Sequence, residues 1–116
     1  MQLAAGCFGL AALGGLTMVA IRLKGAPWPP MWLALGHGAI AATGLGLLGY
    51  EAYDPGVPQL AQAALGIFVL AALGGAAIFV LFHLKRRPLP IPIILGHGLL
   101  ALVGLALLLT SLYRAS

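Results

Sequence analysis

Between residues 55 and 84 the chain reads PGVPQLAQAALGIFVLAALGGAAIFVLFHL, thirty residues without one charged side chain. A helix needs roughly 20 mainly apolar residues to cross the hydrocarbon core of a bilayer, and an uncharged run of about 18 already marks a candidate span. Three further uncharged stretches of 21, 26 and 26 residues occupy positions 1–21, 25–50 and 88–113. The sequence therefore predicts four transmembrane helices.

The composition of the 116 residues excludes an ordinary soluble domain. Hydrophobic residues make up 62 % of the chain and charged residues 7 %, against about 25 % charged residues in soluble domains, and the mean hydropathy is +1.09. The net charge of +4 comes from basic residues divided among the flanks of the predicted spans, which indicates membrane topology rather than nucleic-acid binding. We expect membrane lipids as partners and no nucleic acid.

Lipid offers the backbone no hydrogen bonds, so each apolar run is expected to be an α-helix. We place these helices near residues 3–23, 31–50, 60–83 and 91–112. All 8 prolines fall in the connections or in first helical turns, where a missing N–H costs little. The first run lacks the basic start and the short apolar core of a signal peptide, so we interpret it as a retained helix.

The distribution of charge predicts the orientation. Arg22, Lys24 and residues 85–87 are basic and flank the first and third connections, whereas the second connection carries Glu51 and Asp54. Basic connections stay in the cytoplasm. We therefore expect a multi-pass protein of a bacterial inner membrane, with both termini on the outer side.

The two halves of the chain resemble each other at an offset of 60. Ala-Ala-Leu-Gly-Gly begins at Ala11 and again at Ala71, Leu-Gly-His-Gly begins at Leu35 and again at Leu95, and a gapless comparison of 46 positions from Leu3 onward finds 19 identities. This similarity predicts a tandem duplication. Small residues four apart within these motifs are typical of closely packed membrane helices, so we interpret Ala-Ala-Leu-Gly-Gly as structural.

The predicted fold is an all-α integral membrane protein made of two helical hairpins, the first over residues 1–58 and the second over residues 59–116. Copies with an even number of helices share one orientation, so a pseudo-twofold axis along the membrane normal is expected to relate them. Two architectures are open: a four-helix bundle within one chain, or two hairpins that also pair between chains.

No acidic side chain lies at mid-membrane in the predicted spans, and the residue that remains as a candidate for chemistry is histidine. His37 and His97 are equivalent in the two halves and lie roughly 10 Å below the cytoplasmic edge, at 1.5 Å per residue. Intramembrane ionisable residues are costly and usually face the bundle interior. Two facing imidazoles suit a flat macrocycle, and haem iron takes axial histidine. We therefore expect haem b with His37 and His97 as its metal ligands.

The residues expected around this haem are the two histidines, the glycines that flank them and a stripe of small residues four and seven positions further on. They are His37, His97, Gly36, Gly38, Gly96, Gly98, Ala41, Gly44, Ala101 and Gly104. Basic side chains at the cytoplasmic turns, namely Arg22, Lys85 and Arg86, are expected to pair with the propionates. The arrangement resembles membrane b-type cytochromes, in which histidines from neighbouring helices clamp a haem inside a bundle.

Two functions follow as hypotheses. The first is an electron-transfer subunit that passes single electrons between a quinol or a partner protein and a larger redox complex. The second is a non-catalytic assembly subunit of a respiratory or photosynthetic complex, as a homo-oligomer or with partner subunits, in which the histidines bind a chlorin pigment or only a backbone carbonyl. No constellation for hydrolytic or transfer chemistry is visible, so we expect no enzyme activity from this chain alone.

Two further features limit these hypotheses. The chain resembles small multidrug exporters in size, but its first helix lacks the membrane-embedded glutamate on which that family depends. A carrier or pore is therefore disfavoured. His83 corresponds to Leu23 and stands beside the basic run, so we expect it at the membrane interface rather than in the site.

Overall fold

The computed structural model describes residues 1–115, which form four long helices and one short π-helical turn. The elements are α1 (Gln2–Leu23), α2 (Met31–Glu51), α3 (Gln59–Ile78), η1 (Phe79–His83) and α4 (Ile91–Ala115). The prediction of four helices is confirmed, and, when η1 is counted with α3, their limits differ from the predicted ones by three residues or fewer. The one local difference is that the third helix ends in the π-helical turn η1 rather than as a regular α-helix.

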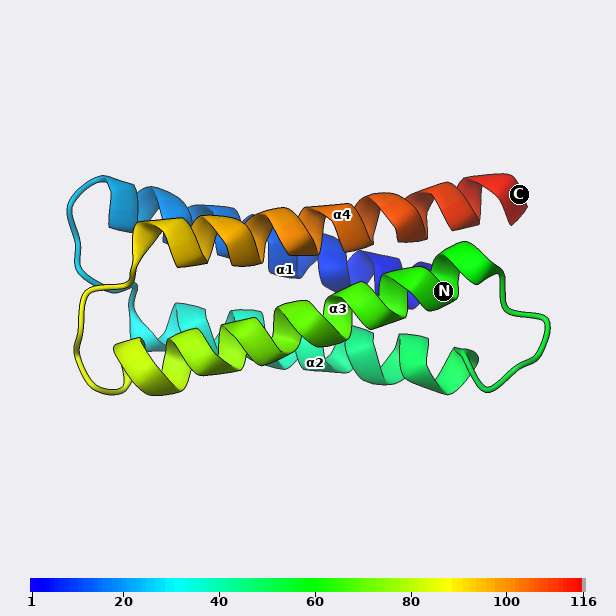
Figure 1. Ribbon diagram of the computed structural model, residues 1–116, viewed down its shortest axis with the longest axis horizontal. Coiled ribbons are helices and arrows are strands. Elements are labelled where there is room, and N and C mark those ends of the chain that lie inside the picture. The colour runs from blue at the N-terminus through cyan, green and yellow to red at the C-terminus, as the bar shows by residue number, and fades with distance from the viewer. Residues whose placement is uncertain (116) are drawn as a thin grey trace.

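The four helices lie side by side along one axis, in a bundle of 45 × 21 × 21 Å (Figure 1). The α1–α2 connection and the loop that precedes α4 lie at one end, and the α2–α3 connection lies at the other end with both termini. The most extensive contacts are within the hairpins α1–α2 and α3–α4, whereas α1 with α4 and α2 with α3 meet less extensively. One chain thus forms the bundle, with a less extensive interface between its hairpins.

Proline and glycine define the helix ends for local reasons. Pro30 and Pro58 are the N-caps of α2 and α3, where an imino nitrogen without a proton leaves no helical hydrogen bond unmade. The Pro30 carbonyl accepts hydrogen bonds from the N–H groups of Leu33 and Ala34. After α1, Gly25 has φ +114°, a backbone conformation that side chains disfavour and that turns the chain out of the helix.

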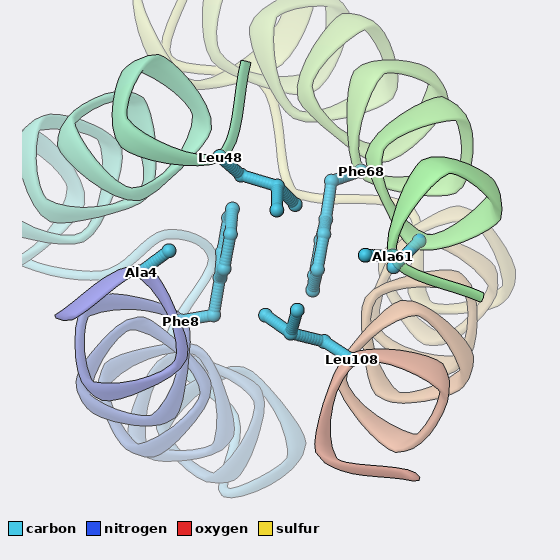
Figure 2. Packing of buried hydrophobic residues seen from close by; sticks show 7 residues of the cluster. Ala4, Phe8, Leu48, Ala61, Phe68 and Leu108 are labelled. Atoms are coloured by element: carbon cyan, nitrogen blue, oxygen red, sulfur yellow. The ribbon is translucent and has the colours of Figure 1, made fainter. Parts of the chain in front are cut away.

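The main core lies where the two hairpins meet, toward the end that carries the termini. The Phe8 and Phe68 rings stack there with centroids 3.7 Å apart and planes within 3°, and Figure 2 shows Leu48 and Leu108 on opposite edges of the stack. Ala4 is fully buried beside them. Phe8 and Phe68 are sixty residues apart, as are Leu48 and Leu108, so these equivalent positions of the two halves occupy equivalent places in the core.

The outer surface of the bundle is apolar. Leu13 and Leu73, another pair sixty residues apart, expose 63 % and 64 % of their surfaces. Helices that are apolar on all sides occur inside large proteins or in membranes. All four helices, counting α3 together with η1, are long and apolar enough to cross a membrane.

Candidate cofactor site between the helical hairpins

His37 lies on α2 and its ring rests against α1. Its Nδ1–H donates a hydrogen bond to the Ala11 carbonyl oxygen at 2.7 Å, and this carbonyl can only accept, so Nδ1 carries the proton. A Cβ on Gly15 would lie 3.2 Å from the His37 Cε1 atom. The ring therefore occupies space that a side chain at this glycine would restrict, and the Ala-Ala-Leu-Gly-Gly motif forms the seat of the histidine.

His97 lies on α4 in the same relation to α3. A Cβ on Gly75 would lie only 2.9 Å from the His97 Cε1 atom. The ring lies against the carbonyl of Ala71, the counterpart of Ala11, but its buried Nδ1 makes no hydrogen bond of normal geometry within residues 1–115. Each hairpin thus seats its own histidine on its own glycine pair, and one of the two rings has an unsatisfied nitrogen.

The two imidazoles meet edge to face across the hairpin interface. Their centroids are 6.2 Å apart and their planes differ by 77°. Two imidazoles that bind one metal from opposite sides through nitrogens about 2.0 Å from it have centres about 6 Å apart, since each nitrogen lies about 1.1 Å from its ring centre. Each metal–nitrogen bond lies in the plane of its own ring, so one ring would have to turn from the edge-to-face arrangement before both nitrogens could point at one metal.

The Nε2 atoms are the candidate ligand atoms. In neutral His37 the proton on Nδ1 leaves a lone pair on Nε2, and neither His37 nor His97 uses Nε2 in a hydrogen bond to the part of the chain that the structure describes. Metal-binding histidines commonly donate their other ring N–H to a backbone carbonyl, which fixes tautomer and orientation. The His37–Ala11 hydrogen bond has this form.

Residues 1–115 contain no group of three or more histidine, cysteine or carboxylate side chains placed to hold one metal ion. A metal held by protein alone would need more ligands than two imidazoles supply. In haem the porphyrin provides the four equatorial nitrogens, so two axial histidines complete the coordination. The donor set therefore fits haem better than a bare ion.

The small residues expected beside the macrocycle do not line an open space, because phenyl rings cover the two buried glycines among them. Gly44 and Gly104 are buried, but the phenyl rings of Phe8 and Phe68 fill the space above them: a Cβ there would lie 3.2 Å and 3.0 Å from those rings. The half-buried Ala41 and Ala101 stand between these glycines and the histidines. A macrocycle that extended along these stripes would have to displace the phenyl stack.

The glycines beside the histidines do not line an internal space. A Cβ added at any of the four would meet nothing within 4 Å; they are Gly36, Gly38, Gly96 and Gly98. These glycines therefore leave the outer surface of α2 and α4 smooth, whereas the glycines that make room for the rings are those of α1 and α3. Sequence periodicity alone did not distinguish the two sets.

The basic residues expected at the propionates lie at the end of the bundle that carries the two basic turns. Arg22 Nε–H donates a hydrogen bond to the Leu89 carbonyl oxygen at 2.9 Å, and the Leu89 N–H donates to the Pro27 carbonyl. Arg22 thus links the two basic turns. Lys85 and Arg86 are exposed.

His83, which the sequence places at the membrane interface, is buried within the bundle. It is 6 % exposed, whereas its counterpart Leu23 is 57 % exposed, and its Nε2–H donates to the Pro29 carbonyl oxygen at 2.8 Å. The π-helical hydrogen bond from the Leu84 N–H to the Phe79 carbonyl changes the register of this last turn. No pattern in the sequence marks that turn, so periodicity could not find this buried histidine.

No protein-family model, no curated protein and no solved structure matches the chain.

Proposed function

We propose that the chain crosses a membrane four times, with its basic turns in the cytoplasm and both termini on the outer side of a bacterial inner membrane. The apolar outer surface supports insertion, since water would contact it in a soluble bundle. The length of 45 Å is similar to a bilayer with its headgroups, about 40 to 45 Å. The distribution of basic residues supports the orientation.

The two hairpins arose by tandem duplication in this proposal, and a pseudo-twofold axis along the membrane normal relates residues 1–58 to residues 59–116. The identities at an offset of 60 support it. So does the equivalent environment of paired positions: each histidine rests on its own Gly-Gly pair, and each phenylalanine covers its own buried glycine.

The function that the site supports best is one-electron transfer by a haem b held between the hairpins, with His37 and His97 as axial ligands. The observation that carries it is the pair of imidazoles from the two hairpins with ring centroids 6.2 Å apart, a spacing close to that of two imidazoles on one metal. The hydrogen bond from His37 to Ala11 supports it because it pre-orients one ligand. Haem would supply the redox change, and the bundle would fix its ligands and its exposure.

A haem needs a flat space between the two rings, and the hairpin interface is the place for it. This interface is less extensive than the contacts within each hairpin. The Phe8–Phe68 stack lies in the same interface, so haem binding is expected to displace these phenyl rings, while each histidine stays on its own glycine seat and the spacing of the two imidazoles is kept.

The test is the visible spectrum of the chain purified in mild detergent, before and after dithionite. Haem gives Soret and alpha bands that change on reduction. His37→Ala and His97→Ala should each abolish these bands, and added imidazole should restore them if the fold persists. His83→Leu is the matched control, because its counterpart is already Leu23, and it should retain the bands. Half the colour lost in each single variant would mean separate cofactors and would overturn the shared haem.

A second candidate function is a non-catalytic assembly subunit of a respiratory or photosynthetic complex, as a homo-oligomer or with partner subunits. The seating of His37 on Gly15 and its bond to Ala11 favour it, because together they form a packing unit that needs no cofactor. The ring separation is also usual for edge-to-face contact. A colourless preparation in the same experiment supports this function, and red absorption supports a chlorin.

A further inference from the structure

A second feature lies outside the histidine pair, at the end of the bundle that carries the basic turns. A hollow of about 770 Å³ opens there, lined among others by Trp28, Pro29, Met31, His83 and Arg86. Neither His37 nor His97 lines it. Its volume lies within the range of small-molecule sites, which are mainly apolar with a few placed polar groups.

The π-helical turn η1 is what brings a histidine to this hollow. In the first hairpin the corresponding turn is regular, and Leu23 points outward with 57 % of its surface exposed. In the second hairpin η1 buries His83 to 6 % exposure, and Phe79 stacks on the His83 ring with centroids 5.3 Å apart and planes at 17°. Single π-turns are frequent at functional sites because they re-aim side chains.

The hydrogen bonding of His83 defines what a ligand must offer. The Pro29 carbonyl can only accept, so His83 Nε2 carries a proton, and in the neutral ring Nδ1 is an acceptor. This Nδ1 is buried and has no hydrogen-bond partner among the described residues. A buried acceptor without a donor is costly. A hydroxyl group is the simplest ligand group that would satisfy it, and because Nδ1 is buried, side chains at the rim of the hollow would have to move aside for that group to reach it.

We propose that this hollow binds the ring of a membrane hydroquinone, with one phenolic hydroxyl donating to His83 Nδ1. The aromatic ring would lie among Trp28, Pro29 and Met31, Arg86 could donate to the second oxygen, and the isoprenoid tail would leave into lipid. A phospholipid phosphate is a poorer occupant, because it has only acceptors and would require His83 to take up a second proton before Nδ1 could donate to it.

The proposal concerns binding alone and is testable whether or not the chain holds haem. The full chain in nanodiscs, with Trp32→Phe so that Trp28 is the one fluorophore of its type, is titrated with a hydroquinone that carries a decyl tail. We expect saturable quenching of Trp28 fluorescence. The dimethyl ether of the same hydroquinone has no hydroxyl and should bind about tenfold more weakly or worse, the loss of affinity expected for one lost hydrogen bond. Because the two ligands are compared on the same chain, an effect of mutation on folding cannot explain the difference.

His83→Leu should weaken hydroquinone binding to the same extent and should abolish the difference between hydroquinone and ether, with unchanged helical circular dichroism. In ¹⁵N-histidine NMR of the parent chain, hydroquinone should shift the Nδ1 signal of His83 more than that of His37. Equal affinity for hydroquinone and ether would overturn the proposal. So would loss of the quenching when phosphatidylglycerol replaces phosphatidylcholine, which would assign the hollow to an anionic headgroup.

Discussion

His37 donates its Nδ1 proton to the carbonyl oxygen of Ala11 at 2.7 Å, from the second helix of its hairpin to the first. This contact joins the two motifs of the first half into one unit, because the glycines that follow Ala11 also make room for the ring. In the second half the glycine seat recurs beneath His97, but the buried His97 Nδ1 makes no hydrogen bond of normal geometry. Leu-Gly-His-Gly supplies the imidazole, and Ala-Ala-Leu-Gly-Gly supplies its acceptor and its space. The physical feature that the two halves share is the glycine seat beneath each ring.

Alanine substitutions at the glycines beneath the histidine rings should weaken the proposed haem binding to different extents. A Cβ would lie 2.9 Å from the His97 ring at Gly75, 3.2 Å from the His37 ring at Gly15 and within 4 Å of nothing at Gly66. Gly75→Ala should therefore displace a ring most and weaken haem retention most, Gly15→Ala less, and Gly66→Ala not at all, while helix propensity favours Ala by up to about 1 kcal/mol. Haem content per chain after detergent washing measures this order, and equal retention in all three variants would contradict it.

The buried glycine beneath each phenylalanine should tolerate no side chain. At Gly104 a Cβ would lie 3.0 Å from the Phe68 ring, and the Phe8 ring stacked on Phe68 restricts its movement. Gly104→Ala should destabilise the bundle by about 1 to 3 kcal/mol. The matched control is Gly46→Ala, where a Cβ meets nothing within 4 Å and the counterpart Ala106 already carries one. Unfolding in mixed detergent micelles gives both values, and the two variants should differ clearly.

The phenyl stack should couple the two hairpins. Phe8→Ala and Phe68→Ala each remove a buried aromatic ring and should cost about 3 kcal/mol or more. Because the rings stack on each other, a double-mutant cycle should yield a coupling of about 0.5 to 1.5 kcal/mol. Leu10→Ala, at an outward position 59 % exposed, is the control and should show little cost and no coupling. Additive effects of the two phenylalanine variants would exclude an energetic role for the stack.

Arg22 should hold the two basic turns together. Its hydrogen bond to the Leu89 carbonyl is worth about 1 kcal/mol, and without it the loop before α4 should open more often. In Arg22→Ala, trypsin should therefore cut at residues 85–87 several-fold faster than in the parent chain in detergent. Lys24→Ala removes an exposed basic residue of the same turn and should leave the rate unchanged. Identical rates in both variants would show that this bond does not restrain the loop.

Cysteine accessibility should report the orientation. In a Cys7→Ser background, Pro55→Cys and Pro88→Cys place single thiols at exposed positions of opposite ends of the bundle without changing any charge. Basic turns in the cytoplasm imply that a membrane-impermeant maleimide labels position 55 in intact cells and labels position 88 only after permeabilisation. The reverse pattern would invert the proposed topology.

The helices and their limits follow from local sequence. An uncharged run of 21 or more residues favours a membrane helix whatever its neighbours are, and Pro30 and Pro58 begin α2 and α3 because proline fixes its own backbone and lacks a proton. The pairing of helices into hairpins follows from the short connections. None of these features requires knowledge of which faces meet.

The choice of inward faces was decided only by tertiary packing. The helices are apolar on all sides, so no polar stripe distinguishes lipid from interior. The sequence predicted His37 and His97 as a pair, and in the structure the centroids of their rings are 6.2 Å apart. The sequence could not predict that Phe8 fills the space at Gly44 or that a π-turn buries His83. Such contacts depend on the shapes of two helices at once, and the order of residues along one helix does not specify that complementarity.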